Sequence, residues 1–141
     1  MLPLRHAAGW RVAGVVLLVF VLAATMVPAV WVFPSRGEFM KWFVHVDKWL
    51  HGITFVFLAV WFAGQYRPQS YWRIGLGLIL FGFLTEGCQR LVTYRSADWF
   101  DIAADAAGII VGLTIATAGL GGWSLRVEKW YLRRTAGAEI D

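Results

Sequence analysis

Residues 101–120 read DIAADAAGIIVGLTIATAGL, an apolar run that opens with two acids one helical turn apart, Asp101 and Asp105. About 20 helical residues cross the roughly 30 Å of hydrocarbon in a bilayer, so this run is long enough to span a membrane. Three further apolar stretches have similar lengths: residues 10–30, 46–66 and 74–92. No stretch alternates apolar and polar residues over the ~10 residues of a transmembrane β-strand. The sequence therefore predicts an all-α polytopic membrane protein, a bundle of four transmembrane helices.

The composition also indicates a membrane protein. Of the 141 residues, 59% are hydrophobic and 16% are charged, and the mean hydropathy is +0.60. A soluble domain carries about a quarter charged residues. We therefore expect a single membrane domain over residues 1–141. Aromatic residues at the ends of the apolar stretches are expected to be interfacial anchors: Trp10 and Trp31, Trp49 and Tyr66, Trp72 and Tyr94, and Trp99 and Trp123.

The first apolar stretch has two interpretations. Arg5 and Arg11 ahead of it, and small residues at Ala23 and Ala24, are typical of a secretory signal. The apolar character continues as far as Phe33, past the core of a short signal. An uncleaved first helix is the favoured interpretation.

The positions of lysine and arginine predict the orientation, because cytoplasmic loops are enriched in both residues. Most of them fall in the N-terminal region, in the loop between the second and third helices and in the tail: Arg5, Arg11, Arg67, Arg73, Arg126, Lys129, Arg133 and Arg134. We therefore expect both termini in the cytoplasm and the protein in a bacterial inner membrane. The sequence pI of about 9.6 then reflects topology, and no nucleic-acid partner is expected.

Two segments outside the predicted spans have helical amphipathic patterns. Ser35 and Glu38 have capping-box spacing, and apolar residues then recur as far as Leu50, which predicts an interfacial helix on the outer side. In the tail, residues 123–135, aromatic and basic residues occupy different faces. This pattern is typical of a basic amphipathic helix that lies on anionic lipid.

Ionisable residues gather at the outer end of the predicted bundle, as three pairs at helical spacing: Asp47 with His51, Glu86 with Arg90, and Asp101 with Asp105. Ionisable groups at membrane depth are costly and usually face a protein interior or a wet cavity. The sequence therefore predicts one outer-leaflet site. Its candidate binding residues are Asp47, Lys48, His51, Glu86, Gln89, Arg90, Arg95, Asp98, Asp101 and Asp105.

Simpler explanations exist for some of these residues. Asp98 and Asp101 favour helix N-termini, where they cap free N–H groups, and Glu86 with Arg90 has the spacing of a surface ion pair. Capping does not explain Asp105, which lies one turn deeper and must pair, accept hydrogen bonds or take a proton. Cys88 is the single cysteine, which excludes an internal disulfide and favours a packing role.

Helix packing is predicted by small residues in the fourth apolar stretch. Ala104, Gly108 and Gly112 recur every four residues, and such glycines let a second helix approach closely. Packing within the chain is favoured over dimerisation, and the oligomeric state stays open.

The polar motifs occur in a characteristic order on three consecutive predicted spans: Asp47-Lys48-x-x-His51, then Glu86-x-x-Gln89, then Tyr94-Arg95-x-x-Asp98-x-x-Asp101-x-x-x-Asp105-x-x-Gly108-x-x-x-Gly112. In this order the chain resembles the VanZ-like family of small bacterial membrane proteins over about residues 40–115. The resemblance implies that Asp47, Lys48, His51, Glu86, Gln89, Arg95, Asp101 and the residue at 105 are the family's polar positions. Position 105 departs from the family, which most often has Asn there. The family is named for a factor associated with teicoplanin resistance, so the resemblance implies a cell-envelope role without a particular reaction.

Two functions fit these residues best. In the first, Lys48, Arg90 and Arg95 bind an anionic lipid or a lipid-linked head group, since Arg contacts phosphate with two N–H groups. The expected partners are then membrane lipids, a lipid-linked cell-wall precursor or a lipoglycopeptide. In the second, a membrane-embedded hydrolase or transferase uses His51, Glu86 or Asp101 in acid–base catalysis, with Asp47 orienting the imidazole.

A third function, proton-coupled transport, is less favoured because four short helices leave little room for alternating access. No cofactor is expected. A metal centre is not expected either, because the site offers a single histidine, His51, as a nitrogen ligand.

Overall fold

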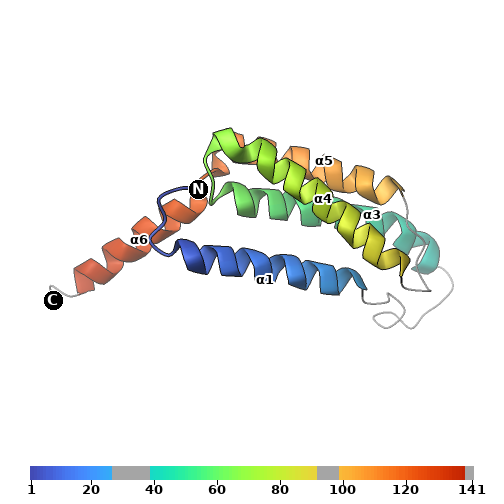
Figure 1. The fold of residues 1–141 in the computed structure, drawn as a ribbon, viewed down its shortest axis with the longest axis horizontal. Helices are drawn as coiled ribbons and strands as arrows, with labels where there is room; N and C mark the ends of the chain where they lie inside the picture. The colour runs from blue at the N-terminus through green and yellow to red at the C-terminus, as the bar shows by residue number, and fades with distance from the viewer. Residues whose placement is uncertain (27–38, 92–98, 139–141) are drawn as a thin grey trace.

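The computed structural model describes the backbone of residues 1–26, 39–91 and 99–138, and the side chains of residues 1–26, 48–91 and 99–134. These residues form helices and no strand, which confirms the all-α class for the part of the chain described. The elements are α1 (Ala7–Met26), α3 (Phe39–Ala63), the 3-10 turn η1 (Pro68–Ser70), α4 (Tyr71–Arg90), α5 (Trp99–Ile115), the π-helical turn η2 (Ala116–Leu120) and α6 (Trp123–Ala138). Figure 1 shows α1, α3, α4 and α5 lying side by side along the long axis of the molecule. Helix α6 extends away from them at the end that carries both termini.

Two helical segments are long and apolar enough to span a membrane: Ala7–Met26 and Trp99–Leu120. A third apolar helical segment, Lys48–Ala63, is shorter. The 20 residues of α4 include Arg73, Glu86 and Arg90, which lower its hydropathy. Within the described residues, two of the four predicted spans are therefore helices that are long and apolar enough to cross a membrane.

The second predicted span begins earlier than expected. One continuous helix, α3, runs from Phe39 to Ala63, so the predicted interfacial helix and the span after it are joined without a break. Residues 39–51 contain neither Gly nor Pro, the two residues that most disfavour a helix interior. At its other end α3 stops before Gly64, and Pro68 begins the short turn that leads into α4.

The closest helix contact in the bundle is between α3 and α5. A Cβ atom on Gly108 would collide with the carbonyl oxygen of Gly52, and one on Gly112 would lie 2.6 Å from the carbonyl oxygen of Val56 and 2.7 Å from Cβ of Ala59. The absence of a side chain at both glycines therefore allows the two backbones to touch. The predicted packing role of Gly108 and Gly112 is confirmed, and their partner is a helix of the same chain.

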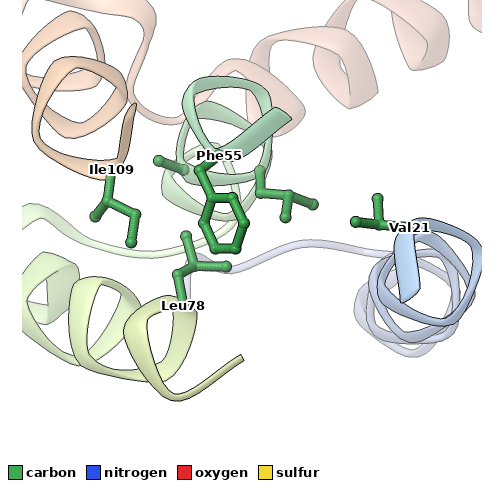
Figure 2. Packing of buried hydrophobic residues seen from close by; sticks show 6 residues of the cluster. Val21, Phe55, Leu78 and Ile109 are labelled. Carbon is green, nitrogen blue, oxygen red and sulfur yellow. The ribbon is translucent and has the colours of Figure 1, made fainter. Parts of the chain in front are cut away.

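The apolar core is small and draws on all four helices of the bundle. Figure 2 shows Phe55 of α3 between Leu78 of α4 and Ile109 of α5, with Val21 of α1 approaching from the other side. Many large apolar side chains instead face outward, and they come from the same four helices. Examples are Val12, Val16, Phe20, Trp49, Ile53, Trp72, Leu76, Leu80, Phe83, Ile110 and Val111.

Glycines make the sharp connection between α5 and α6. Gly119 has φ 143° and Gly122 has φ 69°, conformations that side chains disfavour and that let the chain leave the bundle. The guanidinium of Arg126 donates a hydrogen bond to the Gly119 carbonyl oxygen, at 2.9 Å, and stabilises the turn.

The N-terminal segment packs at this same end of the bundle. The backbone N–H of Leu2 donates to the carbonyl oxygen of Gln65, at 2.9 Å. Next to it, the rings of Trp10, Trp61 and Trp123 contact one another with centroids 5.3 to 5.9 Å apart. The ring contacts show that Trp10 and Trp123 join α1, α3 and α6, while the expectation that they are interfacial anchors stays a prediction.

Candidate functional site

Polar side chains are buried between α3, α4 and α5, in the half of the bundle away from the termini. Their exposed fractions lie between 1% and 6%. We call them the polar cluster: His51, Glu86, Gln89, Asp101 and Asp105. Helix α4 contributes Glu86 and Gln89, α5 contributes Asp101 and Asp105, each pair about one turn apart, and α3 contributes His51.

The central contact of the polar cluster joins His51 to Asp105. The imidazole Nδ1 lies 3.0 Å from the carboxylate Oδ1, and both residues are buried. With Asp105 ionised, and so only able to accept hydrogen bonds, the tautomer of His51 that fits this contact carries its proton on Nδ1. The sequence pattern named Asp47 as the residue that orients His51, and the Asp47 side chain lies outside the described residues. The acid that the structure places on the imidazole is Asp105, from a different helix.

The second oxygen of Asp105 lies against α4. Oδ2 has no hydrogen-bond partner among the described residues. A Cβ atom on Gly82 would lie 2.9 Å from this oxygen, so the glycine leaves the space that the carboxylate occupies. One turn along, the Thr85 hydroxyl donates to the Gly82 carbonyl oxygen, at 2.7 Å. A role for Gly82 was not predicted from the sequence. Its position four residues before Glu86 places it on the same face of α4 as that acid.

Gln89 connects the polar cluster to α1. Its side-chain Nε2 donates to the carbonyl oxygen of Thr25, at 3.3 Å, while its Oε1 has no hydrogen-bond partner in the described chain. Two buried acceptor oxygens, Asp105 Oδ2 and Gln89 Oε1, thus lack a donor from the described residues. Buried polar atoms nearly always have a partner, and leaving one without costs about 1–3 kcal/mol. The arrangement favours a bound donor such as a water, a hydroxyl group or an ammonium group.

Lys48 is the cation beside the polar cluster. Its Nζ lies 3.5 Å from Oδ1 of Asp101 and 5.0 Å from the centre of the Phe100 ring, and 31% of the lysine side chain is exposed. Asp101 also lies in the first turn of α5, where a carboxylate meets the positive end of the helix dipole. Asp101 therefore lies where the helix dipole favours a carboxylate and also pairs with the Lys48 ammonium group.

The remaining candidates are not brought into the polar cluster by the described structure. The Arg90 side chain is exposed at the last turn of α4. It makes no ion pair with an acid in the part of the chain described. Arg95 and Asp98 lie outside the described residues. The structure pairs Lys48 with Asp101 and His51 with Asp105, and it buries Glu86 and Gln89 in the same half of the bundle.

The chemistry available at the polar cluster is hydrogen bonding, ion pairing and proton transfer. Within the described ranges, no group of three His, Cys, Asp or Glu side chains is placed to hold a metal ion. An imidazole held by a carboxylate, as His51 is held by Asp105, is the usual form of a general base. Glu86 is buried one turn from Gly82 on the same face of α4.

A further buried acid, Glu128 of α6, lies at the opposite end and was not predicted. Its carboxylate accepts hydrogen bonds from the backbone N–H of Arg5 at 2.8 Å, from the N–H of His6 at 3.0 Å and from the Trp10 indole at 3.0 Å. Burial alone would raise the pKa of Glu128, but these hydrogen bonds and the nearby His6 imidazole lower that pKa below its ordinary value. Because α1 begins at Ala7, Glu128 satisfies N–H groups at the start of that helix and anchors α6 to it.

Comparisons of the chain with protein-family models, with curated proteins and with solved structures give no match. The class of protein that the fold defines is therefore a helical protein with two candidate membrane spans and a buried polar cluster. The resemblance to the VanZ-like family rests on the order of the polar motifs alone.

Proposed function

We propose that this chain is a VanZ-like protein of the bacterial inner membrane in which α1, α3, α4 and α5 all span the bilayer. In this proposal both termini are cytoplasmic and the polar cluster lies at the level of the outer leaflet. The cluster then binds the head group of an anionic or lipid-linked molecule.

The distribution of side chains supports four spans. Large apolar side chains are exposed on all four helices, for example Val16, Ile53, Leu80 and Ile110, while most of the acids with described side chains are buried. A soluble protein rarely exposes contiguous apolar surface of this extent. The 20 residues of α4 extend about 30 Å, the thickness of the hydrocarbon core, although this helix contains charged residues at both ends.

The observation that carries the binding proposal is the pair of buried acceptor oxygens that have no donor among the described residues, Asp105 Oδ2 and Gln89 Oε1. A head group with hydroxyl or ammonium groups supplies the missing donors. Lys48, partly exposed beside the polar cluster, then contacts a phosphate of the same molecule. Lipid-linked cell-wall precursors and phospholipids both combine these features.

Binding of undecaprenyl phosphate to the purified protein in detergent tests this proposal, with native mass spectrometry as the readout. Lys48→Gln should weaken binding roughly tenfold, because a charge-assisted hydrogen bond is lost. Lys129→Gln is the matched control, since Lys129 is exposed on α6 at the opposite end, and it should bind as the wild type does. Equal binding of undecaprenyl phosphate by wild type and Lys48→Gln would contradict the assignment of Lys48.

A link to glycopeptide resistance belongs to the same proposal. A lipoglycopeptide such as teicoplanin carries an acyl chain and meets a membrane protein in the outer leaflet. Expression of the wild-type chain should then raise the teicoplanin concentration that inhibits growth, and Lys48→Gln should reduce that effect. If expression leaves susceptibility unchanged, the link to resistance is wrong and the binding proposal is judged by the lipid experiment.

The contact between His51 and Asp105 favours a second candidate function, acid–base hydrolysis of a lipid-linked diphosphate, in which the P–O–P bond breaks and inorganic phosphate leaves. The imidazole would take a proton from the attacking water. Release of inorganic phosphate from undecaprenyl diphosphate measures this activity. His51→Gln should abolish release while lipid binding is retained, and the absence of release by wild type under conditions where the lipid binds would rule this reaction out.

A further inference from the structure

A cavity lies at the end of the bundle that carries the termini, between α1, α3 and α4. Its volume is about 380 Å³, within the roughly 300–1,000 Å³ usual for small-molecule sites. None of its lining residues belongs to the polar cluster. The cavity is open at Gly77, an exposed residue at which a Cβ atom would meet no heavy atom within 4 Å.

The polar and apolar side chains of this cavity are separated along its length. Tyr66, Ser70 and Arg73 come from the turn between α3 and α4 and from the first turn of α4. Leu18 of α1 and Phe81 of α4 belong to the apolar remainder. Arg73, Gly77 and Phe81 follow at one-turn intervals, so the lining runs from a cation to an aromatic ring over about 12 Å of helix. Such a cavity fits an amphiphile with a polar head and an apolar chain.

The charge of the lining selects an anionic head. No Asp or Glu lines the cavity among the described residues, and Arg73 makes no ion pair there. The Arg73 guanidinium lies over the Trp72 ring, 5.1 Å from its centre, which holds the cation in place and leaves its edge for hydrogen bonding. A second cation, Arg11, reaches the same end, because its Nε contacts Sδ of the lining residue Met1 at 3.3 Å.

We propose that this cavity holds one acyl chain of an anionic phospholipid whose phosphate contacts Arg73. The hydroxyl groups of Tyr66 and Ser70 donate hydrogen bonds to the same head group, and the chain passes Gly77 to lie against Phe81. This site depends on the proposal that the bundle spans a membrane but does not depend on the polar cluster, which lies at the other end.

Native mass spectrometry of the full chain, titrated in detergent with dioleoyl phosphatidylglycerol or dioleoyl phosphatidylcholine, tests the site. The wild type should bind phosphatidylglycerol more tightly. Gly77→Phe should remove one bound molecule of either lipid by filling the cavity. Gly87→Phe is its matched control, because Gly87 lies on the same helix, outside the cavity, with open space around it. Arg73→Gln should weaken phosphatidylglycerol binding roughly tenfold and phosphatidylcholine binding less, because the choline cation balances the charge of its phosphate.

Arg67→Gln is the control for charge, because Arg67 is exposed in the same turn and does not line the cavity. Equal phosphatidylglycerol binding by wild type, Gly77→Phe and Arg73→Gln would overturn the proposal. A loss in Gly77→Phe with no effect of Arg73→Gln would also overturn it, since the cavity would then accept acyl chains regardless of head-group charge. Arg73 is exposed, so its substitution tests the site even if a large residue at 77 prevents folding. Retention of the Gly77-dependent bound lipid in Lys48→Gln separates this cavity from the polar cluster.

Discussion

At the scale of single residues, the pairing of His51 with Asp105 dominates the polar cluster. Each side chain is almost fully buried, and each supplies the partner that makes burial of the other tolerable. Removing one member leaves a polar group without its partner in an apolar bundle. Removing both leaves a cavity that apolar side chains can fill.

A double-mutant cycle on this pair should therefore show strong coupling. His51→Leu and Asp105→Leu should each lower the free energy of unfolding in detergent by about 3 kcal/mol. The double variant should lose much less than the sum, because neither residue then leaves a stranded partner. Losses that simply add in chemical denaturation would show that the two side chains do not interact.

Gly82 provides a second prediction at this scale. A methyl group there would lie 2.9 Å from Oδ2 of Asp105 and would push the carboxylate away from His51. Gly82→Ala should lower the free energy of unfolding by about 1–3 kcal/mol, as overpacking usually does. Gly87→Ala, in open space on the same helix, should raise it by up to about 1 kcal/mol because alanine favours helix. Equal thermal stabilities for the two variants would contradict the contact.

The pairing itself could not be read from the sequence. Spacing within a helix predicts which residues share a face, and it correctly placed Asp101 with Asp105 and Glu86 with Gln89. Which face of α5 meets which face of α3 depends on the rotation of both helices. That rotation is set by the contact of Gly108 with Gly52, and the sequence showed only one side of this contact.

At the scale of helices, the approach of α5 to α3 requires the two small residues Gly108 and Gly112. Gly108→Ala should lower thermal stability by more than Gly82→Ala does, because its methyl group collides with the backbone of Gly52 and not with a side chain that can move. The expected loss is about 2–3 kcal/mol, at the upper end for overpacking. Gly87→Ala again serves as control, and a melting temperature equal to that of wild type would show that α3 and α5 are not in close contact.

The anchoring of α6 by Glu128 should depend on pH. Because the folded state lowers the pKa of Glu128, its contribution to stability is present above the unfolded value of about 4.3 and is lost as the pH falls through the folded value. Protection of the Arg5 and His6 amides against hydrogen exchange, corrected for intrinsic rates, should therefore decrease below about pH 4. The groups that face the carboxylate are these two residues and Trp10.

Glu128→Gln should remove this protection already at neutral pH, since a neutral amide accepts hydrogen bonds more weakly than a carboxylate does. Lys129→Gln, an exposed neighbour, should exchange like wild type. Protection that persists in Glu128→Gln would show that the N-terminal segment is held by other contacts.

At the scale of the whole molecule, the proposed orientation predicts where each end of the bundle lies. Reporter fusions after Ala138 and within residues 35–40 should fall on opposite sides of the membrane, because the basic residues concentrate at the end that carries the termini. A fusion in the turn at Arg67 should report the same side as Ala138. If the fusions at Ala138 and within residues 35–40 report the same side of the membrane, the proposed orientation is wrong, and so is the outer-leaflet position of the polar cluster.

Composition and the length of apolar stretches predicted the helical class, because both depend on local sequence. They did not predict that α3 begins at Phe39, since an amphipathic segment and a span can join into one helix without any local signal. They also missed Glu128, whose partners Arg5 and His6 lie at the far end of the chain. Contacts between such distant positions depend on the assembled bundle.

The hydrogen bonds of Glu128 to Arg5 and His6 can form only late in the synthesis of the chain. His6 and Glu128 are separated by 122 positions, so the ribosome adds residues for roughly ten seconds between making the donor and making its acceptor. During that interval α1, α3, α4 and α5 are made in turn, while the amides before Ala7 have no carboxylate to meet. The amides of Arg5 and His6 are therefore among the last groups to reach their final partner, and a ribosome stalled before α6 leaves them without it, while the hydrogen bond of Leu2 to Gln65 can already form.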